Sequence, residues 1–435
     1  MNIRTLQQLI VSSKDRFLDR KYQDREFSFD FVKGKASVIC GARRSGKTMY
    51  IRKFVQKLVA DGVNPEKICY LHFFDDLFDS DDVKVSQIAD AYYSLYPQYF
   101  TSEDVYFIFD EVEMLKSWGA GLSALIDEHP AHVLVTGSSG RMLSHDIGTE
   151  LRGRDLQYMF FPLSLKEFMK FNGFELTLNG PVLSKSDDAL LRKGFSLFLE
   201  RGSFPEVAVI EDTELRNKIL SSYFDAMYSR DIIERYEVGK AASLRAFMRR
   251  MFRTSGQPQM MGRIENTMKS SGYPLSRPTI AEYIAMMENA SIISEVPMYA
   301  NEKQINLFPK KYYAVDHAFA AVFSQFSPLT GVRIEHAVHA KLLREEKRIF
   351  YYRSKDDYET DFLLADDDMN PIAAYQVTDD FEVSREREIR GISACIEELG
   401  LKEGFILASE GYEDIKTGDA VIHVRPVHEF LVGLL

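Results

Sequence analysis

The sequence predicts an α/β protein whose first domain is a doubly wound parallel sheet, followed by helical and further α/β domains. Short, almost wholly apolar runs recur in the first third of the chain, and segments of helix length separate them. Such strands are typical of a parallel sheet that is covered by helices on both faces. The length, 435 residues, exceeds that of one ordinary core and favours two or three domains.

Four apolar runs predict the strands of this first sheet. They cover residues 36–40, 68–74, 105–110 and 133–136. The first run ends at Gly41, and apolar residues then recur at helical spacing from Lys47 to Val59. A buried strand, a glycine-rich loop and a helix therefore follow one another, and we expect the doubly wound domain to extend to residue 175.

The loop between that strand and that helix has the spacing of a phosphate-binding loop, Gly41-Ala-Arg-Arg-Ser-Gly-Lys-Thr48. The glycines let successive backbone N–H groups face one anion, and the helix adds its positive end. Lys47 is expected to reach the β- and γ-phosphates, and the Thr48 hydroxyl to ligate Mg²⁺. We expect ATP as the ligand, with GTP as the alternative. The expected nucleotide contacts are Gly41, Arg44, Ser45, Gly46, Lys47, Thr48 and Met49.

An acidic pair, Asp110-Glu111, ends the apolar run that begins at Val105. The carboxyl end of a buried parallel strand lies at the crevice where ligands bind. Asp110 is therefore expected to hold Mg²⁺, directly or through water, and Glu111 to polarise the attacking water. The alternative is that both acids cap the next helix. A water-activating glutamate beside the magnesium aspartate favours hydrolysis over transfer to a second acceptor.

Two later segments are candidates for further contacts with the γ-phosphate. The last predicted strand runs into Thr136-Gly-Ser-Ser139, where a hydroxyl would lie between the phosphate loop and the acidic pair, although an ordinary Gly-Ser turn explains the pattern equally well. Leu151-Arg-Gly-Arg154 offers a guanidinium that could act as an arginine finger on a neighbouring subunit. Surface arginines are more often solvated or salt-bridged.

The rest of the chain alternates between helical and mixed segments. Residues 186–235 are expected to be helical with a break at Gly202-Ser-Phe-Pro205, and residues 236–325 helical with a small-strand ending. A helix at 331–346 should then precede a second α/β region. Its expected strands lie near 349–353, 360–364 and 372–377, followed by a helix and two more strands.

Residues 240–279 are strongly basic in an otherwise acidic chain. They hold eight basic residues and one acid, Glu265, whereas the whole chain has a net charge of −11. Ser276 is a suitable N-cap for a following helix whose Ile280, Ile284 and Met287 would face a core. This pattern resembles the second helix of a helix-turn-helix followed by a wing, which would bind double-stranded DNA through its phosphates. The alternative is a winged-helix fold used only for packing.

The chain as a whole resembles a bacterial and archaeal family of AAA-type P-loop ATPases with a nuclease-like C-terminal part. Besides the phosphate loop, the resemblance rests on Phe109-Asp-Glu111 with Trp118, Leu134-Val-Thr-Gly-Ser-Ser139, Gly153-Arg154, Phe161-Pro-Leu-Ser-Leu-Lys-Glu-Phe168, Gly202-Ser-Phe-Pro-Glu206, Tyr228-Ser-Arg-Asp-Ile232, Tyr313-Ala-Val-Asp316 and Val424-Arg-Pro-Val427. Ser203 stands where the family often has a second glycine.

The resemblance implies four domains. They are a P-loop ATPase domain (1–175), a helical region (176–235), a winged-helix module (236–325) and a domain similar to the PD-(D/E)XK nuclease fold (326–435). It also implies that Ser138 is the sensor-like residue and that Arg154 is the finger.

The same resemblance places a magnesium site in the last domain, at Glu335, Asp361 and Gln376. The family's Glu-x-Lys pair is replaced here by Gln376-Val-Thr378. Glutamine is a poor substitute for a carboxylate ligand of magnesium, and threonine carries no positive charge. We therefore expect a degenerate site that cuts poorly or not at all, and a structural or nucleic-acid-gripping role. An active DNA nuclease using Glu335 and Asp361 is the alternative.

Composition limits the remaining possibilities. The three cysteines are far apart, which excludes a disulfide framework or a cysteine-rich zinc site and favours buried reduced thiols. No apolar run is long enough to span a bilayer, and no secretion signal is visible, so we expect a cytoplasmic protein without a membrane partner. The leading hypothesis is an ATP hydrolase that acts on DNA and, with a finger in trans, forms homo-oligomers. An ATP-gated binding or scaffold protein with little turnover is the second hypothesis.

Overall fold

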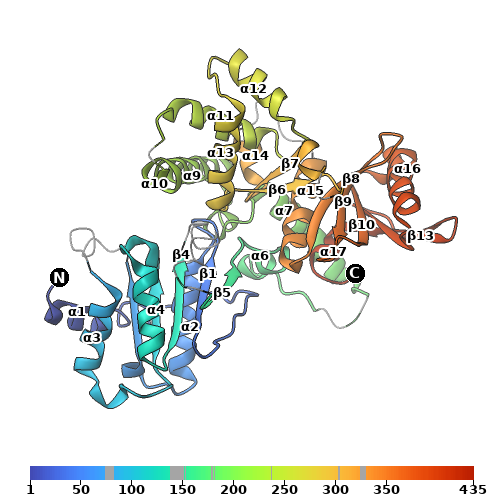
Figure 1. Cartoon of the computed structure of the whole chain (residues 1–435). Helices are drawn as coiled ribbons and strands as arrows, with labels where there is room; N and C mark the ends of the chain where they lie inside the picture. Colours follow the sequence, from blue (N-terminus) through green and yellow to red (C-terminus); the bar gives the residue numbers. More distant parts are fainter. Residues whose placement is uncertain are drawn as a thin grey trace. The chain divides into compact units, whose positions relative to one another are not determined.

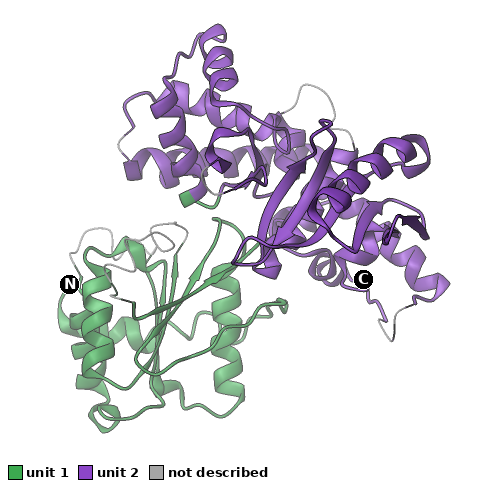
Figure 2. Ribbon diagram, turned by 45° about the vertical axis from the view of Figure 1, so that its right-hand side comes forward, with its two compact units in different colours: residues 1–161, 289–291 green, residues 162–288, 292–435 purple. Residues whose placement is uncertain are grey.

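The computed structural model describes residues 1–73, 83–137, 151, 153–177, 180, 182–236, 238–301, 304–323 and 330–435. The chain forms two compact units (Figure 2). The first comprises residues 1–161 with 289–291, and the second comprises residues 162–288 and 292–435. The predicted four-domain division at residues 175, 235 and 325 is finer than this split and stays a prediction.

Five parallel strands form the sheet of the first unit (Figure 1). Their order is β2-β3-β4-β1-β5, and every neighbouring pair is parallel. The strands are β1 (Ala36–Cys40), β2 (Ile68–His72), β3 (Tyr106–Asp110), β4 (His132–Gly137) and β5 (Asp155–Met159). The doubly wound parallel sheet is therefore confirmed, and the carboxyl ends of β1, β3 and β4 lie along one edge.

Helices cover both faces of this sheet. They are α1 (Ile3–Ser12), α2 (Lys47–Ala60), α3 (Val85–Leu95) and α4 (Trp118–Glu128), with short 3₁₀ turns at Pro65–Lys67, Pro97–Tyr99 and Val112–Met114. Side chains alternate along β1, so Val38 packs in the core formed with α1, α3 and α4. Ile39 points to the opposite core, where α2 and the aromatic segment after α1 pack.

The edge strand β5 was not predicted. None of its residues is fully buried, and it pairs with β1 alone in the described sheet. Asp155 and Gln157 interrupt its apolar character. An edge strand of this kind lacks the continuous apolar run that marks the central strands.

The second unit begins with helices. They are α6 (Leu165–Phe171), α7 (Lys185–Arg201), α8 (Pro205–Ala208), α9 (Thr213–Ala226), a π-helical segment η5 (Met227–Ile233), α10 (Glu234–Tyr236), α11 (Ala241–Arg253), α12 (Met261–Ser270) and α13 (Arg277–Asn289). The predicted helical region with a break at Gly202-Ser-Phe-Pro205 is confirmed. Ser276 Oγ accepts a hydrogen bond from the Thr279 amide, as an N-cap does, and Ile280, Ile284 and Met287 are buried as expected.

A short hairpin follows these helices. Strands β6 (Ile293–Pro297) and β7 (Lys310–Ala314) are antiparallel, with the 3₁₀ turn η6 (Ile305–Leu307) between them, and α14 (Ala318–Phe323) comes next. Three helices and a hairpin occur in the order expected of a winged helix, but the assignment itself stays a prediction.

Two motifs of the resemblance meet in the second unit, at the break between α7 and α8. The Asp316 carboxylate accepts hydrogen bonds from the Ser203 amide at 2.6 Å, the Ser203 hydroxyl at 2.8 Å, the Phe204 amide at 3.0 Å and the Ala318 amide at 2.7 Å. Gly202 has a φ of +93°, and a Cβ there would lie 2.8 Å from an Asp316 oxygen. These motifs are therefore structural, and Ser203 adds a hydrogen bond to this network.

The chain ends in a mixed six-stranded sheet ordered β12-β13-β11-β10-β9-β8 (Figure 1). Its elements are α15 (Thr330–Leu342), a 3₁₀ turn (Leu343–Glu345), β8 (Arg348–Arg353), β9 (Glu359–Ala365), β10 (Pro371–Thr378), α16 (Phe381–Leu399), β11 (Glu403–Ala408), β12 (Glu413–Thr417), β13 (Ala420–Pro426) and α17 (Val427–Leu431). Strands β8, β9 and β10 are antiparallel, and β10, β11 and β13 are parallel. The helix-and-strand order was predicted correctly except for polar β12, which makes a third strand after α16, and for the short final helix α17.

Two further expectations concern single residues and membranes. Cys40, Cys69 and Cys395 are buried free thiols, and burial raises the pKa of Cys69 and of Cys395 to about 12. None of the helices in the described ranges is long and apolar enough to cross a membrane.

Candidate functional site

The phosphate loop leaves β1 at a point where the backbone has no room for a side chain. A Cβ on Gly41 would lie 2.1 Å from the Phe160 carbonyl oxygen, just beyond β5. Arg25 lies beside the loop, because its guanidinium donates to the Ser45 carbonyl at 2.8 Å and to the Phe161 carbonyl at 2.7 Å. It also lies 4.4 Å from the centre of the Phe160 ring. Glycine at residue 41 and Arg25 together fix where the loop begins and how it curls.

The helix after the loop presents an open N-terminus. Gly46 is the N-cap of α2, has a φ of +103° and cannot offer a capping side chain. The N-cap of this 14-residue helix therefore offers no side-chain acceptor to the first amides, which suits an incoming anion. The Ser45 hydroxyl is buried and has no hydrogen-bond partner among the described residues.

The loop lysine is already directed at this site. Lys47 is 3% exposed, and its ammonium donates to the Gly41 carbonyl at 2.8 Å and to the Ala42 carbonyl at 3.2 Å. Arg44 and Met49 are exposed, and Arg44 has the left-handed φ of +70°. The predicted loop residues thus surround one region, with Lys47 and Ser45 inside it and Met49 at its surface.

Asp110 is fully buried at the carboxyl end of β3. It accepts hydrogen bonds from Thr136 on β4 and from the Tyr70 hydroxyl, and a hydrogen bond with Thr48 also stabilises its charge. Burial raises the pKa of Asp110, and the negative charge of Glu111 adds to the rise; His72, Thr136 and Thr48 oppose it. The two expected magnesium ligands, Thr48 and Asp110, therefore lie side by side.

Glu111 follows in the left-handed conformation, with a φ of +58°. Non-glycine residues adopt this conformation rarely, and it is often associated with functional sites. The Glu111 amide donates to Thr136 Oγ1 at 3.0 Å, while the same hydroxyl donates to Asp110. Thr136 therefore orients the Asp110 carboxylate and holds the backbone of Glu111, whose residue remains partly exposed.

Two of these positioning residues, Tyr70 and His72, were missed from the sequence. Tyr70 and His72 end the strand next to β3, and His72 Nε2 lies 3.8 Å from Asp110 Oδ2. Thr136 was noted only as one of several hydroxyls. The parallel register, which pairs His72 with Asp110, is the signal that would have identified the two β2 residues.

The sensor and finger candidates come from the chain between β4 and β5. Ser138 lies outside the described residues. Arg154 lies just before β5, at the level of Ala36, so a whole strand of about 13 Å separates it from the phosphate loop of its own chain. Its guanidinium forms an ion pair with Asp127. The trans-acting role of Arg154 stays a prediction and would require this ion pair to open.

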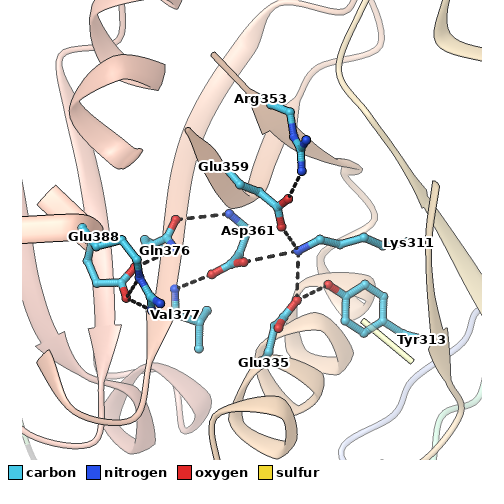
Figure 3. Close-up of polar contacts among 10 residues, drawn as sticks. Lys311, Tyr313, Glu335, Arg353, Glu359, Asp361, Gln376, Val377 and Glu388 are labelled. Atoms are coloured by element: carbon cyan, nitrogen blue, oxygen red, sulfur yellow. Dashed lines mark hydrogen bonds and ion pairs between the residues drawn. The ribbon is translucent and has the colours of Figure 1, made fainter. Parts of the chain in front are cut away.

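A second polar site lies in the C-terminal sheet, around one buried ammonium (Figure 3). Lys311 on β7 is 1% exposed, and its Nζ lies 3.1 Å from Glu335, 2.9 Å from Glu359 and 3.3 Å from Asp361. Glu335 belongs to α15, and the two other acids belong to β9. The structure therefore brings the predicted Glu335 and Asp361 together, with Lys311 and Glu359 as partners that were not predicted.

Gln376 also reaches this lysine–carboxylate cluster. Its Oε1 accepts from the Asp361 amide at 3.3 Å, and its Nε2 donates to Glu388 at 2.8 Å. A pocket of about 500 Å³ opens beside the cluster, lined by Glu335, Glu359, Asp361, Gln376, Arg387 and Glu388 among others. Gln376 is thus a neutral link between the backbone of Asp361 and the carboxylate of Glu388.

Burial and charge alter the proton affinities in this cluster. Burial raises the pKa of Asp361 to about 7; Glu335 adds to the rise, and Lys311 opposes it. Burial disfavours the charged form of Lys311, but the carboxylates around it, Glu335 foremost, hold its pKa well above the usual value. The ammonium therefore remains charged at neutral pH.

The basic helices hold a buried arginine, two of whose nitrogens have no partner among the described residues. Arg250, at the end of α11, is 7% exposed, and its Nε and Nη1 make no hydrogen bond with any described residue. Burial lowers the pKa of Arg250, and the charges of Arg253 and Arg263 lower it further, so three guanidiniums interact at this end of α11. Arg253 and Arg263 are exposed. By contrast, Arg277 on α13 pairs with Glu265 at 2.9 Å.

The fold and the first site define a P-loop NTPase domain of the AAA type. In agreement, residues 33–169 match the family model described as "AAA domain". Residues 192–330 match a model described as "Domain of unknown function (DUF8612)". Neither model covers half of the chain, so the family of the whole protein is not fixed by them.

Curated relatives extend over most of the sequence. An uncharacterized protein of Methanocaldococcus jannaschii is 26% identical and covers 95% of this chain and 91% of its own length. An uncharacterized protein of Haemophilus influenzae is 29% identical and covers 76% of this chain and 78% of its own length. Among solved structures, a Walker-type ATPase of Pyrococcus abyssi aligns with a TM-score of 0.42 at 13% identity, over 71% of this chain and 99% of its own.

Proposed function

We propose that this protein is an ATPase that binds ATP with Mg²⁺ at the phosphate loop and hydrolyses it. The observation that carries the proposal is the convergence of Lys47, Thr48 and Asp110 at the carboxyl edge of the sheet, with Glu111 next to them. A scaffold that only binds nucleotide needs the loop but gains nothing from a partly exposed glutamate held in a strained conformation beside the magnesium aspartate.

The residues present fit a magnesium–nucleotide complex. The start of α2, which Gly46 does not cap, suits phosphate oxygens, and so does the buried Ser45 hydroxyl, which has no partner within the described ranges. Thr48 with Asp110 offers the oxygen ligands that Mg²⁺ prefers. Magnesium, when bound, would neutralise charge on the β- and γ-phosphates. Lys47 would exchange its two loop carbonyls for phosphate oxygens, and Glu111 would orient the attacking water.

The Glu111→Gln variant tests this proposal and separates it from an ATP-gated scaffold. Glutamine keeps the size of the side chain but cannot accept a proton, so kcat for ATP hydrolysis should fall by about 100-fold or more, with ATP affinity unchanged. Turnover measured by phosphate release and affinity measured with a fluorescent ATP analogue give the two readouts. An unchanged, very slow turnover in both proteins would favour the scaffold hypothesis.

A second function, binding of double-stranded DNA by the basic helices, is favoured by Arg250. The Arg250 guanidinium is buried and close to two others, and its Nε and Nη1 have no acceptor in the described part of the chain. The start of α12 lies in the same part of the chain, since Arg263 is in its first turn. A DNA phosphate would supply the missing charge without any reading of bases, which agrees with the predicted phosphate contacts.

Arg253→Ala and Arg263→Ala test the DNA proposal, with Arg277→Ala as the matched control. Each of the first two variants should weaken binding to duplex DNA of any sequence and reduce the salt slope by about one, because one phosphate contact is lost. Arg277 is already paired with Glu265, so its loss should change the slope less. Fluorescence anisotropy at several salt concentrations measures these slopes; equal slopes in all four proteins would contradict the proposal.

A further inference from the structure

The nuclease-like fold would imply a magnesium ion among Glu335, Asp361 and residue 376, but these residues do not fit one as they are arranged. Magnesium requires several oxygen ligands pointing at one position in near-octahedral geometry. Here the inward-facing oxygens of Glu335, Glu359 and Asp361 already point at Lys311 Nζ, at 2.9 to 3.3 Å (Figure 3). Gln376 turns its oxygen to the Asp361 amide and its amide group to Glu388.

The hydrogen bonds of the ammonium are fully used. A lysine ammonium has three N–H groups, and three carboxylates surround Lys311. Its side chain is 2% exposed, so it does not reach the solvent. The other oxygen of Asp361 accepts from the Val377 amide at 2.9 Å, and Glu335 also accepts from the Tyr313 hydroxyl. Neither Lys311 nor Asp361 is therefore available to bind or orient a water molecule.

The lysine comes from outside the C-terminal sheet and is held in place independently. It lies on β7 of the hairpin. The segment that follows β6 is joined to β8 by a hydrogen bond from the Tyr299 amide to the Tyr351 carbonyl at 2.8 Å. The Tyr351 hydroxyl donates back to the Pro309 carbonyl at 2.7 Å, just before β7. The position of Lys311 is therefore fixed by backbone contacts as well as by charge.

We infer that the Lys311 ammonium is the resident cation of this cluster, where it occupies the place of a divalent metal and joins the hairpin to the C-terminal sheet. The charges support this assignment. Arg353 pairs with Glu359 at 3.0 Å, so the three carboxylates, when all are ionised, face one ammonium and one guanidinium and leave one negative charge in excess. Replacing the ammonium by a divalent cation would balance the charges. The cluster is thus a latent metal site that opens when the lysine is removed.

Lys311→Met tests the inference in the full-length protein, because methionine fills a similar volume without charge. Binding of Mn²⁺ is measured without nucleotide, by electron paramagnetic resonance of the free ion. We expect Lys311→Met to bind one more Mn²⁺ ion than wild type does. Its affinity for this ion should be at least tenfold higher than any affinity of the wild-type cluster for Mn²⁺. The added site should disappear in Lys311→Met/Asp361→Asn. Lys311→Arg, which keeps the charge, should not gain it.

Lys310→Ala is the matched control, since the neighbouring Lys310 pairs with Glu295 outside the cluster. It should bind Mn²⁺ as wild type does. A folded Lys311→Met protein without the additional site would overturn the inference. The inference would also be overturned if wild type bound Mn²⁺ and Asp361→Asn abolished that binding, because the ammonium would then not occupy the place of the metal. The comparison of wild type with Asp361→Asn decides even if Lys311→Met does not fold.

Discussion

Single residues carry the chemistry of the first unit through their buried polar neighbours. Asp110 is placed by Thr136, Tyr70 and Thr48, and Glu111 is placed by the same threonine. These contacts fix the Asp110 carboxylate and the backbone of Glu111 before any ligand arrives, so little reorganisation of these groups is needed on binding. In the second unit, single residues such as Asp316 and Lys311 instead hold separate segments of the chain together.

Asp316→Asn should destabilise the second unit without affecting nucleotide binding. The substitution replaces one carboxylate oxygen by an amide NH₂ group. This group cannot accept hydrogen bonds from the backbone N–H groups that it then faces. We expect a loss of about 3 kcal/mol in the free energy of unfolding. Urea unfolding followed by circular dichroism measures this loss, and the ATP affinity of the folded variant is the control. An unchanged unfolding midpoint would show that these hydrogen bonds contribute little.

At the scale of elements, most of the architecture could be predicted because local sequence encodes it. The buried strands of the first sheet are continuous apolar runs, and the phosphate loop has a fixed spacing between β1 and α2. The edge strand β5 was missed because its residues are only partly buried. Lys311 was missed for another reason: nothing near β7 in the sequence shows that it will meet acids on α15 and β9. Contacts between distant segments depend on tertiary packing.

Helix α15 and the first turn of α17 contain histidines that should make the second unit sensitive to acid. Burial lowers the pKa of His336 from its ordinary 6.5 to about 3, and burial lowers that of His428 to about 4. Below pH 6.5 these histidines bind protons in the unfolded chain but not in the folded chain. The free energy of unfolding therefore decreases as the pH falls from 6.5 toward these values.

His336→Leu should remove part of this acid sensitivity. His336 Nε2 is buried and has no hydrogen-bond partner among the described residues, so leucine loses little at pH 7. At pH 4.5 the variant should be more stable than wild type by roughly 2–3 kcal/mol, the free energy that corresponds to the shifted pKa. Unfolding free energies at pH 7 and pH 4.5 provide the test. Parallel loss of stability in both proteins on acidification would contradict it.

At the scale of the whole molecule, the chain combines an AAA-type nucleotide unit with a second unit that carries basic helices and a carboxylate cluster around the Lys311 ammonium. The net charge of −11 makes the basic stretch at 240–279 a local feature, which fits a specific anion contact better than a general affinity for nucleic acid. Hydrolysis in the first unit and DNA binding in the second are independent proposals, and a motor that acts on DNA would require both.

ATP hydrolysis by wild type and by Lys47→Ala, with and without double-stranded DNA, tests the central claim most directly. Lys47 is the residue that would contact the transferred phosphate, so we expect wild type to hydrolyse ATP and Lys47→Ala to be at least about 100-fold slower. A change in the wild-type rate on addition of DNA would connect the two units. If wild type binds ATP but releases no more phosphate than Lys47→Ala under either condition, the protein is not an ATPase.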